Sequence, residues 1–217
     1  MTLVHTDDTL AARQADPRYQ RLMKSTRAAA RNGHDAVSMR ELAETCRLSM
    51  TTIYQFCRSK DQLIAEAHVS NMKAFGARIS ARPPRGATAE ERVLSVMRSF
   101  AKALEDEPLS RTLMRAMYSF DPEVSASVAS TGTLFTSVLD AAIGEDSIEN
   151  HDAVIATLAH VFDSVIVGWL TRGHDAKWVR RELETSVHAL FGGTTGSRRN
   201  ATRAKHAPAR RARTRPA

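Results

Sequence analysis

The sequence predicts an all-α protein, with a small group of helices near the N-terminus followed by a larger helical domain. Two observations support this fold class. Apolar residues recur at helical spacing through most of the 217 residues, and the chain shows neither an alternating strand pattern nor an internal repeat. Residues that cap helix N-termini also stand directly before several of these apolar segments, where a side-chain oxygen can accept from a free backbone N–H group.

The first helix is expected to begin at Pro17, because Asp16 can cap it and proline suits the first helical turn. Its apolar positions repeat at helical spacing until Asn32-Gly33, a pair of residues typical of a helix end. The stretch Pro17–Lys60 holds nine basic and three acidic side chains. Such a basic patch on a small helical unit is typical of proteins that bind the phosphate backbone of nucleic acid.

Three closely spaced helix starts follow in residues 38–63. Ser38 begins a Ser-x-x-Glu capping box, Ser49 caps a second helix, and Ser59 caps a third, again with a polar partner three residues later. The helices follow one another with almost no connecting residues, which is the layout of a helix-turn-helix and its supporting helix. We therefore expect the helix after Ser49 to be a recognition helix for double-stranded DNA.

Residues 17–66 resemble the DNA-binding region of the TetR family of transcriptional regulators. Three segments carry the resemblance: Ser38-Met39-Arg40-Glu41-Leu42-Ala43, Leu48-Ser49-x-x-Thr52-Ile53-Tyr54-x-Phe56 and Ser59-Lys60-Asp61-x-Leu63. The chain departs from the family pattern at Thr51, where the family often has glycine, and at Cys57, where it usually has phenylalanine. The first difference can alter which bases are touched, and the second predicts a smaller plug behind the recognition helix.

The chemistry of the recognition helix suggests roles for its side chains. The short hydroxyls of Ser49, Thr51 and Thr52 can approach base edges or phosphates, and Gln55 can pair with adenine through two hydrogen bonds. The resemblance adds further contacts: phosphates for Tyr54 and Lys60, the DNA backbone for Ser38 and Arg40, and a thymine methyl for Met50. The candidate DNA-binding residues are therefore Ser38, Arg40, Ser49, Met50, Thr51, Thr52, Tyr54, Gln55 and Lys60.

The rest of the chain is expected to form further helices. The helix that begins after Ser59 should run to about Ser80, and a stiff polar break follows at residues 82–86. Caps and apolar stripes then predict helices near residues 89–107, 109–120, 122–143, 152–172 and 176–191, and Gly192-Gly193 should end the fold. We therefore expect a DNA-binding domain at 1–66, a ligand-binding and dimerisation domain at 67–193, and a disordered basic tail at 194–217.

Charge is unevenly distributed along the chain. The formal net charge is +7, yet residues 197–217 alone carry eight Arg and Lys side chains and no acid, so the folded part is close to neutral. The tail either adds non-specific affinity for DNA through counterion release or is a solvated extension without a partner. Nothing in its composition suggests that it recognises a base sequence.

Composition and motifs argue against several other classes of protein. Cys46 and Cys57 are too few for a disulfide framework or a zinc site, and we expect both to be small buried hydrophobes in a reducing cytoplasm. Val154–Leu170 is apolar enough to suggest a membrane span, but it contains His160 and Asp163 and is interpreted as a buried helix. With no secretory signal, phosphate-binding glycine loop or nucleophile elbow in the sequence, we expect a cytoplasmic protein that is not an enzyme, does not bind a membrane and uses no metal or cofactor.

The larger helical domain carries methionine and aromatic side chains at helical spacing. Such side chains are typical either of an ordinary core or of a cavity for an apolar ligand. The candidate ligand-binding residues are Met97, Phe100, Met114, Met117, Phe135, Phe162, Asp163 and Trp169. Because a buried carboxylate without a partner is unfavourable, we expect Asp163 either to pair with His160 or an arginine, or to line a polar part of the cavity.

The TetR resemblance implies that the protein is a homodimer. In that family the last two helices pack against their symmetry mates as a four-helix bundle. We expect two apolar stripes to form this interface. They are Val154, Leu158, Val161, Val165 and Trp169 on one helix, and Val179, Leu183, Val187 and Leu190 on the next.

Two further segments, Pro108–Tyr118 and Gly168–Arg172, resemble repressors of steroid and lipid catabolism in actinobacteria. This resemblance implies a repressor that binds an inverted-repeat operator as a dimer and is released by a bulky apolar effector. A sterol-derived or fatty-acid-derived coenzyme A thioester is such an effector. The effector would act by changing the separation of the two recognition helices. The alternative is a constitutive or architectural DNA-binding protein without a ligand.

Overall fold

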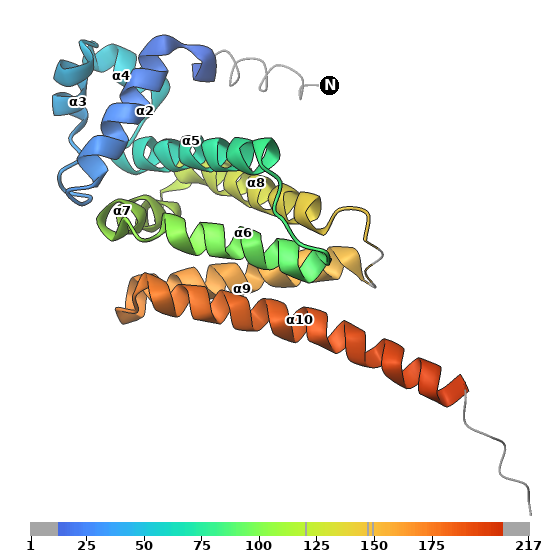
Figure 1. The fold of residues 1–217 in the computed structure, drawn as a ribbon. Coiled ribbons are helices and arrows are strands. Elements are labelled where there is room, and N and C mark those ends of the chain that lie inside the picture. The colour runs from blue at the N-terminus through green and yellow to red at the C-terminus, as the bar shows by residue number, and fades with distance from the viewer. Residues whose placement is uncertain (1–12, 120, 147, 149, 206–217) are drawn as a thin grey trace, which may run out of the picture.

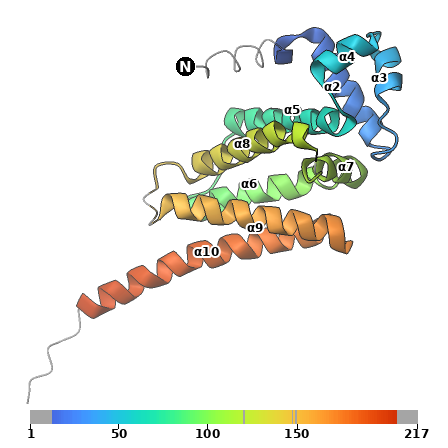
Figure 2. The same ribbon diagram turned by 180° about the vertical axis from the view of Figure 1, so that it is seen from behind.

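The computed structural model describes residues 13–119, 121–146, 148 and 150–205, and over these residues the protein is all-α, as the sequence predicts. The helices are α2 (Pro17–Ala30), α3 (Met39–Cys46), α4 (Met50–Phe56), α5 (Lys60–Ala81), α6 (Ala89–Ala103), α7 (Glu107–Met117), α8 (Ser125–Ile143), α9 (His151–Arg172) and α10 (Ala176–Lys205), with a short 3-10 turn η1 at Pro122–Val124. Figure 1 shows α2, α3 and α4 at one end, and α5 running from that end along α8. Helices α9 and α10 form the opposite layer, and the far end of α10 leaves the body of the molecule (Figure 1 and Figure 2).

The predicted N-caps are confirmed in the helix-turn-helix. The hydroxyl of Ser38 accepts from the backbone N–H of Glu41 at 3.3 Å, and the hydroxyl of Ser49 accepts from Thr52 at 3.0 Å. Ser59 accepts from the N–H of Gln62 at 3.0 Å, while the Gln62 side chain accepts from the N–H of the residue before the cap. Each cap satisfies a backbone donor that has no partner inside its own helix, so these helix starts are determined locally.

The helix-turn-helix and the larger domain share helix α5 and part of one core. The expected boundary at residues 66 and 67 falls inside α5, which continues to Ala81. Leu113 and Ala116 of α7 belong to the same buried cluster as Leu22 of α2 and Ile53 of α4. Movement of α7 relative to α5 therefore disturbs the packing beneath the recognition helix.

The core of the larger domain is built around an aromatic group. Phe100 of α6 lies with its ring centroid 4.2 Å from that of Phe75 on α5 and 5.0 Å from that of Phe135 on α8. Gly168 of α9 lets α10 approach closely, since a Cβ at that position would lie 3.1 Å from the Trp178 ring. These contacts hold α5, α6, α8, α9 and α10 together as a single packed body.

Two helices are long and apolar enough, by length and composition, to cross a membrane, namely Pro122–Ile143 and His151–Arg172. Both contribute to the core of the helical domain, where Leu139, Leu158 and Ile166 are fully buried. About a third of the most apolar stretch of each helix is buried within the protomer.

The two stripes expected at the dimer interface are instead part of the protomer's own core, and that expectation is wrong. Leu158 and Trp169 on α9, and Val179, Leu183 and Val187 on α10, are almost completely buried inside the single chain. A helix that is apolar on more than one side does not indicate by spacing alone which side faces its own core.

The expected end of the last helix at Gly192-Gly193 is also wrong, because α10 continues to Lys205. A glycine in a helix costs about 1 kcal/mol relative to alanine but does not remove a backbone donor, and the next proline is Pro208. The part of the tail up to Lys205, which was predicted to be disordered, is therefore helical, and the remainder, residues 206–217, lies outside the described residues.

Candidate DNA-binding surface and ligand cavity

Helix α4 turns one side to the core and the other to solvent. Ile53 and Phe56 are buried beneath it, whereas Thr51, Tyr54 and Gln55 are exposed, with 53% of the Tyr54 surface accessible. A large aromatic side chain at that exposure, ending in a hydroxyl, can reach a phosphate without losing contacts in its own core. Of the residues predicted to approach base edges, Thr51 and Gln55 lie on this outer side of α4, whereas Thr52 is half-buried and Ser49 is the cap residue before the helix.

Several other predicted DNA-binding residues already have protein partners. The hydroxyls of Ser38 and Ser49 serve as caps, and the Ser49 and Thr52 hydroxyl oxygens lie 2.8 Å apart. The ammonium of Lys60 donates to the backbone oxygen of His34 at 3.4 Å. Met50 is half-buried. We conclude that Ser38, Ser49 and Thr52 position the helices in addition to any contact with DNA.

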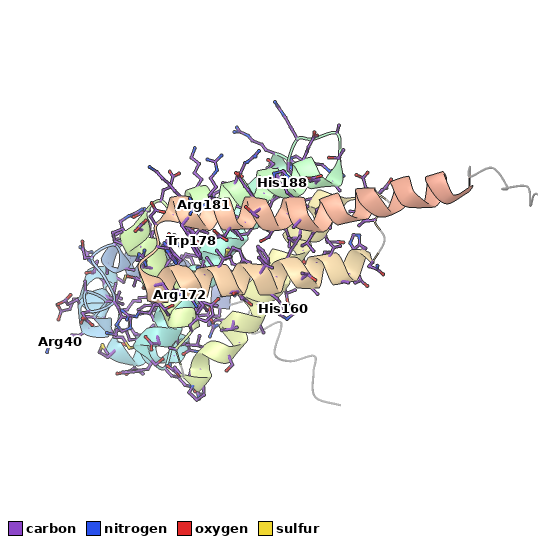
Figure 3. All side chains as sticks on the ribbon, turned by 90° about the horizontal axis from the view of Figure 1, so that it is seen from below. Arg40, His160, Arg172, Trp178, Arg181 and His188 are labelled. Atoms are coloured by element: carbon purple, nitrogen blue, oxygen red, sulfur yellow. The ribbon has the colours of Figure 1, made fainter. Side chains whose placement is uncertain are left out.

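Arg40 stands apart from these residues. It lies on α3 with 85% of its side chain accessible, and its only described ionic neighbour is Glu44, one turn along the same helix, at 3.4 Å. Figure 3 shows Arg40 projecting from the end of the molecule that carries the helix-turn-helix. An exposed i, i+4 pair of this kind is weak, so the guanidinium is available to a phosphate.

The turn between α3 and α4 has an unusual backbone at Arg47. This residue adopts a left-handed conformation, with φ of 55°, and its N–H donates to backbone carbonyls at the end of α3. The N–H of Leu48 donates to the Ala43 carbonyl at 2.8 Å, which closes the turn. This arrangement ends α3 sharply and fixes the angle at which α4 leaves it.

A buried carboxylate connects the helix-turn-helix to the larger domain. Glu66 of α5 is 7% exposed and accepts from the Tyr19 hydroxyl of α2 at 2.6 Å and from the Ser127 hydroxyl of α8 at 3.2 Å. The Arg13 guanidinium donates to Glu66 at 3.3 Å and also to the backbone oxygen of Phe56, at the end of the recognition helix, at 3.1 Å. Burial and the charge of Glu66 raise the pKa of the Tyr19 hydroxyl above its ordinary value.

Sequence reasoning missed Glu66, although a signal was present. It is the one acidic residue in the buried run from Leu63 to Val69. Outer contacts reinforce the same junction: the Ser59 hydroxyl donates to Asp121, and Arg58 pairs with Glu123 of η1 at 3.4 Å. Each of these interactions joins the start of α5 to the segment that leads into α8.

A cavity of about 250 Å³ lies between helices α5, α7, α8 and α9 of the larger domain. Its wall is mainly apolar. Five of the predicted ligand-binding residues line it, namely Met114, Met117, Phe135, Phe162 and Asp163. The other lining residues are His68, Met72, Tyr118, Val128, Thr131, Gly132, Thr136 and Ala159.

The remaining predicted ligand-binding residues lie elsewhere. Phe100 belongs to the core and contacts Phe135 and Phe162 of the cavity wall from behind. Met97 is buried in the core, away from the lining residues. Trp169 is completely buried, with the Arg111 guanidinium 4.4 Å from its ring centroid and donating to its backbone oxygen at 2.9 Å. Trp169 is therefore a core residue, and its contacts with Arg111 hold α7 against α9.

The expectation that Asp163 is buried is wrong. It is exposed at the rim of the cavity, where its carboxylate accepts from the Tyr118 hydroxyl at 3.2 Å. The expected pairing with His160 is not among the described contacts of these residues, and the His160 Nδ1 atom lies 2.7 Å from the backbone oxygen of Ala156. Burial and the charge of Asp163 raise the pKa of the Tyr118 hydroxyl above its ordinary value.

Both cysteines are buried and free, as the sequence predicts. Cys57 follows α4 and is completely inaccessible, and burial raises the pKa of its thiol to about 12. It therefore fills space behind the recognition helix as a small neutral side chain.

A capped helix-turn-helix with an exposed recognition helix, joined through a shared helix to a domain with an apolar cavity, defines a DNA-binding transcriptional regulator. Comparison with known families agrees. Residues 23–67 match the model of bacterial regulatory proteins of the TetR family, and residues 86–190 match the tetracycline repressor-like C-terminal domain. The chain belongs to the TetR family.

Curated relatives extend the similarity over most of the chain. The HTH-type transcriptional repressor KstR of Rhodococcus jostii is 29% identical over 196 residues, which cover 89% of this chain and 91% of the relative. The KstR repressor of Mycolicibacterium smegmatis is 25% identical over 192 residues, covering 87% of this chain and 94% of the relative. These proteins are DNA-binding regulators rather than enzymes.

Solved structures show the same fold. A TetR transcriptional regulator from a Rhodococcus species superposes with a TM-score of 0.66 at 16% identity, over 80% of this chain and 94% of that one. FadR of Thermus thermophilus, a TetR-family repressor solved in complex with lauroyl-CoA, gives a TM-score of 0.59 at 18% identity, over 80% and 93% of the two chains.

Proposed function

We propose that this regulator is a repressor that binds an inverted-repeat operator as a homodimer and is released by an apolar effector. The observation that carries the proposal is the outer side of the helix-turn-helix, where Thr51, Tyr54 and Gln55 of α4 and Arg40 of α3 are exposed together over a locally capped scaffold. The similarity to KstR repressors supports repression as the mode of action.

The side chains divide into base readers and phosphate contacts. Thr51 and Gln55 are exposed on α4 and short enough to address base edges in the major groove. Tyr54 and Arg40 address phosphates on either side of the groove, and Lys60 does so from the start of α5, where the helix N-terminus also favours an anion.

The outer side of α9 and α10 supports the homodimer. Figure 3 shows these two helices side by side on one face of the molecule. On α9, Ala156, Ser164, Val167 and Thr171 are exposed one or two turns apart, and all are small or uncharged. A second copy packing there would form a four-helix bundle with close backbone approach and would cover the exposed Val167 side chain.

The cavity supports an apolar effector. Met72, Met114 and Met117 are flexible side chains that adapt to a bulky ligand, and Phe135 and Phe162 provide flat apolar walls. At about 250 Å³ the cavity is small for a whole sterol-derived or fatty-acid-derived thioester. The acyl or ring portion of such a thioester would enter between the helices. Its coenzyme A portion would stay outside the cavity, beyond Tyr118 and Asp163. The fold relative FadR was solved in complex with lauroyl-CoA, a molecule of this chemical type.

The contacts around Glu66 provide a route from the cavity to the DNA. A ligand that separates α5 from α8 would act on the bond between Glu66 and Ser127, one helical turn from the cavity residue Thr131. The same carboxylate holds Tyr19 of α2, and Arg13 links it to the end of α4. In a dimer, rotation of each helix-turn-helix would change the spacing of the recognition helices relative to successive major grooves.

Selection of bound sequences from random DNA tests the operator. We expect an inverted repeat. Gln55→Ala should relax the preference at one base pair in each half-site and weaken binding by about 1–3 kcal/mol, and Tyr54→Phe should weaken all sites alike. Gln20→Ala, an exposed glutamine on α2, is the matched control and should change neither. A selected set without an inverted repeat would contradict the proposal.

The dimer has its own test. Replacing Ser164 and Val167 with Arg places two charges on the outer side of α9, where they have no room to remain solvated in a packed interface. Sedimentation should show a monomer of unchanged helical content that has lost its preference for the operator. Thr133→Arg, on the exposed side of α8, is the control and should remain dimeric. If the double variant is still a dimer, the dimer interface lies elsewhere on the protein.

A further inference from the structure

Two polar atoms buried at the cavity have no hydrogen-bond partner in the described part of the protein. His68 of α5 is 3% exposed, and its Nδ1 atom is unpaired. Thr131 of α8 has a buried Oγ1 atom that is also unpaired. Both residues line the cavity, from two different helices. Neither belongs to the set of residues that the sequence suggested for ligand binding.

The hydrogen bonding of the Thr131 hydroxyl differs from that of neighbouring threonines on α8. Thr133 donates its hydroxyl to the carbonyl of Ala129 at 3.1 Å, and Thr136 donates to the carbonyls of Gly132 and Thr133. This return to the helix backbone is the usual way for a threonine hydroxyl in a helix to be satisfied. The hydroxyl of Thr131 lacks that bond and is therefore available to another partner.

Unpaired buried polar groups are unfavourable in folded proteins. The described residues contain five such atoms, and two of them belong to residues that line this one cavity, which needs an explanation. A structural role does not provide it, because neither atom has a partner among the residues that the structure describes. A ligand group between α5 and α8 does, because it can satisfy both atoms while its apolar remainder packs against the methionine and phenylalanine walls.

We propose that His68 and Thr131 bind a neutral hydroxyl or carbonyl oxygen at the buried end of the apolar effector. This inference rests on the ligand cavity of the proposed function and specifies the chemistry of its occupant. A hydroxyl can donate to one of the two residues and accept from the other, and a carbonyl can accept from the imidazole N–H and from the threonine hydroxyl.

The electrostatics of the cavity select a neutral group. Complete burial lowers the pKa of His68 to about 4, so the imidazole is uncharged near pH 7. The residues that line the cavity include neither Lys nor Arg, and the carboxylate among them, Asp163, lies at the exposed rim. A carboxylate at the buried end would therefore be desolvated without a counter-charge, which is strongly unfavourable.

Four ten-carbon probes separate these chemistries: decane, decan-1-ol, decan-2-one and decanoate. Binding to the full-length protein is measured from the rise in melting temperature over a concentration series. We expect the alcohol and the ketone to bind about tenfold more tightly than decane, because each gains hydrogen bonds that the alkane cannot make. Decanoate should bind more weakly than the alcohol at pH 7.5.

Two variants identify the residues. In Thr131→Val, which keeps the shape of the side chain, the affinity for decan-1-ol and decan-2-one should fall about fivefold to tenfold, and that for decane should stay the same. His68→Phe should behave in the same way and should not lower the melting temperature of the free protein, since it removes an unpaired polar atom. Thr133→Val is the matched control on the same helix, and its probe affinities should equal those of the wild type.

The outcomes separate this inference from the proposed function. If all four probes bind equally, or if Thr131→Val weakens decane as much as decan-1-ol, the polar site is wrong and the apolar cavity stands. If none of the four probes binds, both the ligand cavity and the polar site are contradicted. Selective loss of the alcohol and the ketone in Thr131→Val, but not in Thr133→Val, is the supporting result.

Discussion

Helices α5 and α8 approach each other at two places where a polar residue of α5 lies near a hydroxyl residue of α8. The two places differ in their hydrogen bonds. At the domain junction, the Glu66 carboxylate of α5 accepts from the Ser127 hydroxyl of α8 and from Tyr19 and Arg13. At the cavity, two residues further along α5 and one turn further along α8, His68 and Thr131 have no partner for a buried polar atom. Among the described residues, the Glu66 carboxylate has hydrogen-bond partners on other helices, whereas the His68 Nδ1 and Thr131 Oγ1 atoms have none.

The difference distinguishes a structural role from a binding role. A buried polar group contributes to stability only when its hydrogen bonds are made, and it destabilises the folded state when they are not. The junction at Glu66 should therefore hold the fold together, whereas the site at His68 should weaken the free protein and strengthen the liganded one.

The largest effect should follow from removing the junction carboxylate. Glu66→Ala leaves the buried Tyr19 hydroxyl and the Arg13 guanidinium without their partner, and we expect the free energy of unfolding to fall by about 3–5 kcal/mol in urea denaturation. Glu105→Ala, an exposed glutamate beyond the end of α6, is the control and should change it by less than about 0.5 kcal/mol. Equal stabilities of the two variants would mean that Glu66 is not a structural joint.

The second effect concerns pH at the cavity. The pKa of His68 is lowered from 6.5 to about 4 in the folded protein, so the unfolded chain binds more protons between these values. The free energy of unfolding should therefore decrease as the pH falls from about 6.5 to 4, by about 3 kcal/mol from this residue, and should gain nothing from it at higher pH.

His68→Phe isolates this contribution, because titration of all other groups is common to both proteins. Urea denaturation at pH 7.5 and at pH 4.5 should show a smaller loss of stability in the variant than in the wild type. Parallel losses in the two proteins would show that His68 is protonated in the folded state, and the argument for a neutral ligand group would lose its basis.

The smallest effect is expected at Ser127. Ser127→Ala removes one of the three hydrogen bonds to Glu66 and should lower the free energy of unfolding by about 1 kcal/mol. Ser137→Ala, at an exposed position of the same helix, provides the baseline. Because Ser127 joins α8 to α5, the variant should also reduce the ratio between operator affinities without and with an apolar effector, measured by fluorescence anisotropy. An unchanged ratio would place the coupling in another contact.

The DNA-binding half of the molecule could be predicted from the sequence because its information is local. Ser38, Ser49 and Ser59 each stand three residues before the backbone donor that they satisfy, and the structure confirms all three caps. Such spacings are properties of a single helix and need no knowledge of its neighbours. The TetR resemblance also implied a phosphate contact for Tyr54, and this side chain is exposed on the outer side of α4.

The regulatory half was predicted less well, because an apolar stripe does not show whether its own chain or a partner covers it. The stripe containing Leu158 and Trp169 was assigned to a dimer interface and lies in the core, while Asp163 was assigned to the interior and lies at the rim. Helical spacing gives the angle between side chains but not the direction in which the neighbouring helix lies. The misplaced end of α10 has a similar origin, since glycine weakens a helix without ending it.

By itself, the sequence determined that this chain is all-α, where most of its helices begin, and which side of the recognition helix can meet DNA, because capping and amphipathic spacing act over a few residues. Only the tertiary structure decided that Glu66 is satisfied and that His68 is not. Both are polar residues in one buried stretch of α5, and Glu66 takes its partners Tyr19 and Ser127 from helices distant in the chain. Whether a buried polar atom has a partner depends on how those helices pack, which no local pattern encodes.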